Sequence, residues 1–408
     1  MNMTLVLKLA CSPETKKFLQ DTISQFTDAF NRATKFGYDS KTTNGCTIHK
    51  ERYRAERNLT QLPSQLICAM ISKSTEALSS VRALQKKHDT ACKKNPKLKH
   101  KTFKCPKSER QSVRYDGKRA SMVNLKEGWA TLASIEGRQE VKFFVPKHYE
   151  PYLNSKVCMS DLVWDGKNRL FLHVVVEVME GPFVPNGFVA GVDLGICRPA
   201  VMSTVDGKFN RFFGKRKWRD IEQKKLNYKR ILQSKGTKSA RRKLKKLSGK
   251  VNRFRKDCDH VLSKQIVESV PKGSIIVFEN LKDIRERCGR GKGRKQNGRM
   301  HRWSFDRLFL YTEYKAKLRG IKTSKVDPRN TSRRCSRCGY ISKKNRKNQS
   351  LFDCKDCHFT LNADLNGPRN IAYKFAICGM PQMVGCVVNH PNVARSLSDK
   401  PTNLFVGS

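Results

Sequence analysis

The sequence predicts a multidomain α+β protein, in which an antiparallel β-barrel with a helical insertion precedes an α/β domain that a four-cysteine ribbon interrupts. Three observations predict this fold class. The chain has 408 residues, which is more than one hydrophobic core organises. Strand-like alternation of apolar and polar residues runs through residues 102–180, and wholly apolar strands follow residue 187. Two Cys-x2-Cys pairs lie close together near the C-terminus.

The β-barrel is predicted to consist of residues 1–10 and 101–186. Residues 1–10 form its first strand, because Leu5, Leu7 and Leu9 alternate with other residues and so share one face of an extended segment. Turn signals separate the later strands, as expected for antiparallel neighbours.

Residues 11–100 are predicted to form a helical insertion in this barrel. Ser12 can cap the first helix and Pro13 fits its first turn, after which apolar residues recur at helical spacing. The stretch GPFVPNG, residues 181–187, contains two prolines and two glycines and marks the boundary with the second half.

The α/β domain is predicted to consist of residues 187–330 and 359–378, with residues 331–358 as the ribbon inserted in it. Its buried strands are FVAGVDLGI, residues 188–196, and GSIIVFENL, residues 273–281, with a short meander and a long basic helical region between them.

Net charge is the strongest compositional signal. The chain has 84 Lys and Arg against 35 Asp and Glu, a formal charge of +49, and such a molecule repels itself unless it binds a polyanion. No apolar run is long enough to span a bilayer, and Lys8 interrupts the short apolar start, so nucleic acid is expected as the partner and a membrane is not. Two polar segments, residues 285–299 and 379–408, are predicted to lack order on their own.

The cysteines indicate one metal site in a reducing compartment. Most of the 15 cysteines are scattered, but Cys335, Cys338, Cys354 and Cys357 have the spacing of a ribbon that holds one structural zinc. An iron–sulfur cluster and two disulfides are the alternatives, and the basic insert KKNRKNQS suits a ribbon hairpin better. We expect a cytoplasmic protein, associated with the nucleoid if its host is a prokaryote. Six basic side chains in the ribbon are candidate phosphate contacts: Arg333, Arg334, Arg337, Lys343, Lys344 and Arg346.

Three acidic residues are candidates for catalysis. Asp193 and Glu279 lie in apolar strands, where an unpaired charge is costly, and Asp364 follows the second cysteine pair. Carboxylates that converge from separate elements can hold two Mg²⁺ ions, which activate water for phosphodiester hydrolysis. The first acid lies in the first strand of a meander, the second lies in a parallel strand that follows a helix, and the third lies beside the last helix. This is the order of elements in an RNase H-like fold.

Four linked motifs then carry a specific resemblance over residues 188–377. GVDLGI, IIVFENL, DPRNTSRRCSRCG and DCKDCHFTLNADLNGPRNIA together resemble the TnpB family of transposon-encoded RNA-guided nucleases, which are related to miniature type V CRISPR effectors. The resemblance implies that Asp193, Glu279 and Asp364 form a RuvC-type catalytic triad with Mg²⁺, and that the ribbon helps to bind target nucleic acid.

The resemblance also implies partners and an activity. The protein would be a monomeric ribonucleoprotein with a guide RNA from the flanking transposon locus, and it would cleave guide-matched double-stranded DNA beside a short flanking motif. The barrel would be its wedge-like domain and the helical insertion its recognition domain. Pro368 departs from the family pattern, and a helix tolerates proline in its first turn, where Pro368 would lie if Asn366 capped this helix. Whether Asn366 and Asn370 orient metal ligands or only cap and pack is left open.

Three other functions are considered. A DNA transposase or integrase uses the same kind of acidic core for strand transfer, and guide dependence would separate the two. A catalytically silent RNA-guided DNA-binding regulator would have lost its acids, which are all present here. A plain zinc-ribbon protein would explain the charge and the cysteines but not the three acids.

Overall fold

The computed structural model divides the chain into two compact units, residues 1–179 and 180–408. The residues that it describes are 1–96, 98–116, 120–195, 198–282, 284, 298, 305–348 and 350–378. The predicted unstructured tail, 379–408, lies outside the described residues, and so does almost all of the basic segment 285–299. Among the described residues no helix is both long and apolar enough to cross a bilayer.

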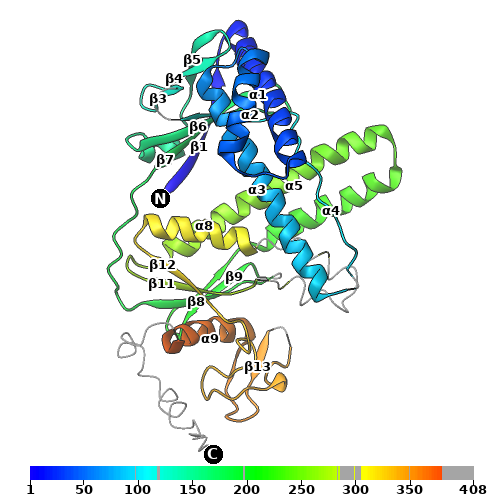
Figure 1. Cartoon of the computed structure of the whole chain (residues 1–408). Helices are drawn as coiled ribbons and strands as arrows, with labels where there is room; N and C mark the ends of the chain where they lie inside the picture. Colours follow the sequence, from blue (N-terminus) through cyan, green and yellow to red (C-terminus); the bar gives the residue numbers. More distant parts are fainter. Residues whose placement is uncertain are drawn as a thin grey trace, which may run out of the picture. The chain divides into compact units, whose positions relative to one another are not determined.

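The first unit contains a seven-stranded antiparallel sheet that is nearly closed into a barrel, in the order β2-β6-β7-β1-β5-β4-β3 (Figure 1). Near its seam, Ser121 Oγ on one edge lies 3.3 Å from Ser160 Oγ on the strand next to the other edge. The predicted first strand is confirmed, since β1 pairs with β5 and β7 and buries Leu5, Leu7 and Leu9. The strands are β1 (Asn2–Ala10), β2 (Val113–Asp116), β3 (Ser121–Asn124), β4 (Trp129–Ser134), β5 (Gly137–Phe143), β6 (Lys156–Trp164) and β7 (Leu170–Glu177).

Helices occupy the expected insertion between β1 and β2. The predicted start of α1 (Pro13–Asp39) is confirmed: Ser12 Oγ accepts a hydrogen bond from the Thr15 amide, and Pro13 is the first helical residue. Two further helices follow, α2 (Gly45–Leu59) and α3 (Ser64–Lys94), and a 3₁₀ helix η1 (Lys147–Tyr152) lies between β5 and β6.

The second unit is built on a five-stranded mixed sheet in the order β10-β9-β8-β11-β12. The first three strands form the antiparallel meander that the sequence predicts, and β11 runs parallel to both β8 and β12. The strands are β8 (Val189–Asp193), β9 (Ala200–Thr204), β10 (Asn210–Phe213), β11 (Ile275–Glu279) and β12 (Lys322–Val326).

Helices cover both faces of this sheet, which makes three layers (Figure 1). Helices α5 (Lys238–Glu268) and α8 (Phe305–Leu318) pack on the face that includes Val192, and α9 (Ala363–Cys378) packs on the face that includes Val189. Helix α4 (Arg216–Lys235) forms a long basic hairpin with α5.

Helix α9 approaches β8 so closely that only glycine fits between them. A Cβ atom on Gly191 would lie 2.0 Å from the carbonyl oxygen of Pro368, a distance that no side chain tolerates. This contact brings the first turns of α9 against the carboxyl end of β8.

The ribbon follows β12 and precedes α9 in the chain. Its cysteines lie in two turns, and it contains η2 (Lys343–Asn345) and β13 (Leu351–Asp353), which pairs antiparallel with β14 (Thr360–Asn362) just before α9. The antiparallel pair β13–β14 thus encloses the second cysteine pair, whereas the basic insert between the two pairs contains η2.

Candidate functional site: three carboxylates beside a cysteine ribbon

The three candidate acids converge at the carboxyl end of the mixed sheet. Asp193 is the last residue of β8 and Glu279 the last of β11, and Phe278 pairs in register with Val192. Because the two strands are parallel neighbours, both carboxylates leave the sheet at the same edge. Asp364 lies in the first turn of α9 and contributes its charge to the surroundings of Asp193.

The pKa values of Asp193 and Glu279 are shifted by burial and by the charges of neighbouring groups. Loss of hydration raises the pKa of Asp193, Arg346 opposes that increase, and the charge of Asp364 adds to it. Loss of hydration also raises the pKa of Glu279, the charge of Asp193 adds to it, and Thr331 and Lys374 oppose it. Burial and mutual repulsion therefore disfavour the ionised forms of Asp193 and Glu279 more than the neighbouring cations favour them.

Asp364 is paired with two arginines. Arg198 Nε lies 3.0 Å from Asp364 Oδ2, and Arg346 Nη2 from the ribbon lies 3.7 Å from Oδ1. Helix α9 also brings Gly367 against Asp193, since a Cβ on this glycine would lie 2.8 Å from Asp193 Oδ2. The last helix therefore adds a third carboxylate and restricts the space around the first.

Asn366 does not cap α9, so the condition under which Pro368 would lie in the first turn is not met. The Asp364 amide donates instead to Asn362 Oδ1, at 2.9 Å, and α9 begins at Ala363. Pro368 therefore lies inside the helix, where it lacks the N–H that would bond to the carbonyl of Asp364.

The four ribbon cysteines form one cluster. Their sulfur atoms all lie within 4.8 Å of one another, with Cys335 Sγ 3.8 Å from Cys357 Sγ and Cys338 Sγ 3.5 Å from Cys354 Sγ. Zinc–sulfur bonds of about 2.3 Å in a tetrahedron place sulfurs about 3.8 Å apart. The cluster is thus consistent with a structural zinc, and the four thiols are free, not paired in disulfides.

Asn366 and Asn370 join the start of the ribbon to α9. Asn366 Nδ2 donates to the Arg334 carbonyl at 2.8 Å and its Oδ1 accepts from the Ser336 amide at 3.1 Å. Asn370 Nδ2 donates to the carbonyls of Thr331 and Arg334 at 2.8 and 2.7 Å. Both asparagines are fully buried, and their hydrogen bonds fix the backbone at the start of the ribbon to α9.

The six basic ribbon side chains divide into two groups. Arg334 stacks 3.9 Å from the centre of the Tyr373 ring and donates to Asn370, and Arg346 contacts Asp364, so both are engaged within the protein. The other four are exposed: Arg333, Arg337, Lys343 and Lys344.

Sequence analysis missed Thr331 and Arg198. Thr331 Oγ1 donates a 2.5 Å hydrogen bond to Glu279 Oε1, across 52 positions in the chain. Thr331 lies in the motif DPRNTSRRC, four residues before the first ribbon cysteine. This position was the sequence signal that could have marked it as a functional residue.

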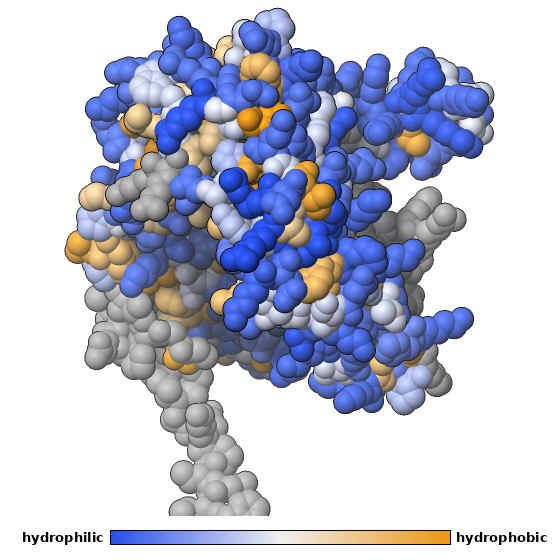
Figure 2. Space-filling model, turned by 45° about the horizontal axis from the view of Figure 1, so that its top comes forward, coloured by the Kyte–Doolittle hydropathy of each residue, from blue (hydrophilic) through white to orange (hydrophobic). Residues whose placement is uncertain are grey.

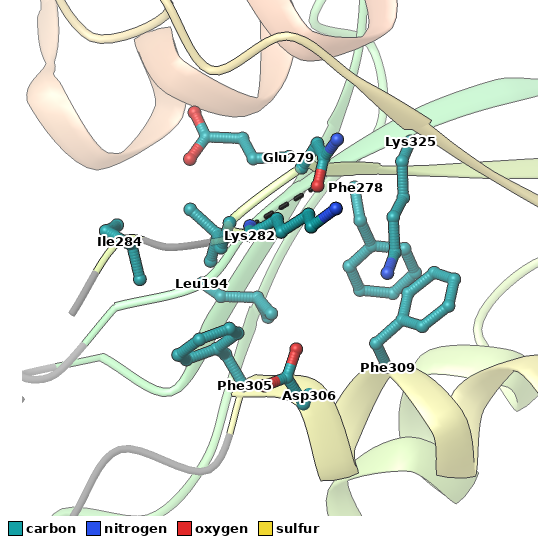
Figure 3. A pocket seen from close by; sticks show the side chains of 11 residues that line it. Leu194, Phe278, Glu279, Lys282, Ile284, Phe305, Asp306, Phe309 and Lys325 are labelled. Atoms are coloured by element: carbon teal, nitrogen blue, oxygen red, sulfur yellow. Dashed lines mark hydrogen bonds between the residues drawn. The ribbon is translucent and has the colours of Figure 1, made fainter. Parts of the chain in front are cut away.

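A cavity of about 410 Å³ opens beside Glu279 (Figure 3). Phe278, Phe305 and Leu194 form apolar walls, and the Lys325 amine lies 3.7 Å from the centre of the Phe309 ring. The cavity lies at the carboxyl end of parallel strands, where open α/β sheets bind their ligands.

Two family models match parts of this chain. The family model described as a Cas12f1-like TNB domain matches residues 305–371, and the one described as a probable transposase, OrfB_IS605, matches residues 173–282. The chain belongs to the TnpB/OrfB family. The first match contains the whole ribbon and Asp364, and the second contains Asp193 and Glu279.

Curated relatives of this TnpB-family chain include nucleases. It is 30% identical over 239 residues to the CRISPR-associated endodeoxyribonuclease Cas12f1 of Sulfoacidibacillus thermotolerans, covering 53% of each protein. It is 29% identical over 295 residues to the putative RNA-guided DNA endonuclease InsQ of Escherichia coli K12, covering 66% of this chain and 69% of InsQ. The match thus spans about half the length of the Cas12f1 relative.

Solved structures show that this TnpB-family chain has a Cas12f-like fold. Cas12f1 in a complex with sgRNA and target DNA aligns with a TM-score of 0.62 at 15% identity, over 88% of this chain and 83% of that one. The mini-RNA-guided endonuclease CRISPR-Cas_phi3 aligns with a TM-score of 0.52 at 13% identity, over 93% of each chain.

Proposed function

We propose that this protein is the RNA-guided DNA endonuclease of a transposon, which cleaves guide-matched double-stranded DNA next to a short flanking motif. One observation carries the proposal: Asp193, Glu279 and Asp364 converge from β8, β11 and α9 at one edge of the sheet. The names of the relatives support it, since Cas12f1 is called an endodeoxyribonuclease and InsQ a putative RNA-guided DNA endonuclease.

The topology of the second unit supports a single RuvC-like nuclease domain formed by residues 187–330 and 359–378. Its meander β8–β10, with β11 and β12 added in parallel and helices on both faces, is the arrangement of RNase H-like nucleases. Residues 331–358 would be an insertion that helps to bind target nucleic acid.

The donor set fits two Mg²⁺ ions. It consists of carboxylate oxygens, the ligands that hard divalent cations prefer, and a bound cation would offset the burial and repulsion that disfavour the ionised forms of Asp193 and Glu279. Asp193, Glu279 and Asp364 would together hold the ions. When bound, the ions supply an activated water and stabilise the leaving oxygen.

The surface chemistry suits nucleic-acid partners. The face drawn in Figure 2 carries mostly hydrophilic side chains with apolar ones scattered among them, and the α4–α5 hairpin and the ribbon are rich in Lys and Arg. The barrel, residues 1–10 and 101–186, would act as the wedge-like domain and residues 11–100 as the recognition insertion. Base pairing with the guide RNA would then recognise the target sequence, while the protein contacts the phosphate backbones of the RNA and DNA.

The test is to purify the protein from a host that expresses its native flanking locus, sequence the RNA that copurifies, and assay Mg²⁺-dependent cleavage of matching DNA. A discrete RNA and cleavage of matched DNA alone are expected. Cleavage that ignores the match between RNA and DNA would contradict the proposal.

A transposase is the second candidate, because one of the matching family models is described as a probable transposase. It predicts cutting or joining at the ends of the element without any guide. The same preparation, incubated with DNA that contains those ends, distinguishes the two candidates.

A further inference from the structure

We infer that Thr331 is a positioning residue for Glu279, and that the base of the cysteine ribbon thereby sets the metal affinity of the carboxylate site. The inference rests on the proposed function, because it takes the three carboxylates to be metal ligands.

The contact between the two residues is short and shielded. Thr331 is 3% exposed, and its Oγ1 lies 2.5 Å from Glu279 Oε1 and 3.0 Å from the Pro328 carbonyl oxygen. A hydroxyl has one proton to donate, and the shorter contact with a carboxylate takes it when Glu279 is ionised. The bond orients the glutamate and leaves its other oxygen free for a cation.

The side chain of Asn370 on α9 fixes the backbone of Thr331. The Asn370 side chain donates to the Thr331 carbonyl at 2.8 Å and to the Arg334 carbonyl at 2.7 Å, from a fully buried position. A buried amide with two such bonds does not exchange them for water at low cost. The backbone of Thr331 is therefore fixed relative to the helix that also carries Asp364.

The same segment continues directly into the cysteine cluster. Asn366 donates to the Arg334 carbonyl and accepts from the Ser336 amide, the residues on either side of Cys335. The segment 331–336 thus contacts the proposed metal ligand Glu279 at one end and contains the candidate zinc ligand Cys335 near the other. Partners of this kind outside the ligand shell fix ligand orientation, and their loss costs about 10- to 100-fold in metal affinity or activity.

The test compares Thr331→Val, which keeps the shape of the side chain and removes its hydroxyl, with Thr331→Ser, which retains the hydroxyl. Mn²⁺ binding by each protein–RNA complex is measured by electron paramagnetic resonance, and cleavage is measured against Mg²⁺ concentration. We expect Thr331→Val to raise the Mn²⁺ Kd and the half-saturating Mg²⁺ concentration about tenfold or more, and Thr331→Ser to stay within about threefold of wild type. Zinc content and melting temperature control for damage to the fold.

Unchanged Mn²⁺ affinity in Thr331→Val would overturn the inference while the nuclease proposal stands. Absence of both Mn²⁺ binding and guided cleavage in the wild-type complex would instead remove the proposed function itself.

A double-variant cycle tests the link to the ribbon. Cys338→Ser, which removes one thiolate, is combined with Thr331→Val, and Mn²⁺ Kd is measured for the single and double variants. If the ribbon acts through Thr331, the double variant binds Mn²⁺ about as weakly as the worse single variant. Independent, multiplying losses would show that the ribbon does not act through this residue.

Discussion

Arg346 of the ribbon points its guanidinium at Asp364 of α9, with Nη2 3.7 Å from Oδ1. The pair joins the insertion to the candidate metal site by a direct charge contact, in addition to the hydrogen bonds at the base of the ribbon. Arg198 and Arg346 together balance part of the charge of this carboxylate.

Replacing Arg346 therefore tests competition between arginine and metal. We expect Arg346→Gln to tighten Mn²⁺ binding in the DNA-free protein, by up to about fivefold, because a partly exposed ion pair contributes little. Lys347→Gln is the matched control, since Lys347 pairs with Asp353 at 2.7 Å. Weaker Mn²⁺ binding in Arg346→Gln would mean that this arginine supports the metal site.

Removing either strand carboxylate tests the catalytic assignment. Asp193→Ala and Glu279→Ala should each reduce cleavage by about 10³-fold or more, because each removes a metal ligand. RNA-dependent DNA binding, measured by gel shift, should remain within a few-fold of wild type, since phosphate contacts supply most of the affinity. Full cleavage by either variant would refute its role as a ligand.

Removing a cysteine tests the zinc site. Cys354→Ser should lower the zinc content measured by elemental analysis and reduce thermal stability and target binding, because zinc binding contributes folding energy to such ribbons. Cys258→Ser is a suitable control, since Cys258 is a half-buried cysteine on α5 outside the cluster. Equal zinc content in Cys354→Ser and Cys258→Ser would rule out Cys354 as a ligand.

The carboxylates should also leave a signature in the pH dependence of stability. Their pKa values are raised in the folded state, so they stabilise the metal-free protein fully below about pH 4, the pKa of unfolded carboxyls, and that stabilisation is lost as pH rises through the folded values. The melting temperature of the metal-free protein should therefore fall from pH 4 to 7 more steeply than that of the double variant Asp193→Asn/Glu279→Gln. Added Mg²⁺ should reduce this difference, and parallel curves for the two proteins would contradict the raised pKa values.

Several features were predictable from the sequence because their signals are local. The alternation of Leu5, Leu7 and Leu9 predicts a strand whichever strands are its neighbours in the sheet. The two Cys-x2-Cys pairs predict a cluster of four thiols because they lie close together in the sequence. Asp193 and Glu279 could be singled out because each ends an apolar strand, where burial of a charge needs a reason. These inferences depend on a residue and its near neighbours in the chain.

The features that complete the site depend on residues far apart in sequence. Only the parallel pairing of β8 with β11 places Asp193 beside Glu279, and only the folded chain brings Thr331 to Glu279. The cap of α9 could not be assigned from composition, because Asn362 and Asn366 are equally suited by residue type and the backbone path alone selects Asn362. By itself the sequence thus determined which acids and thiols are the candidates for the proposed chemistry, through local period, spacing and the cost of burial. The tertiary structure decided which groups meet and how they are oriented, because register, close helix–strand approach and buried hydrogen bonds arise only when distant segments pack.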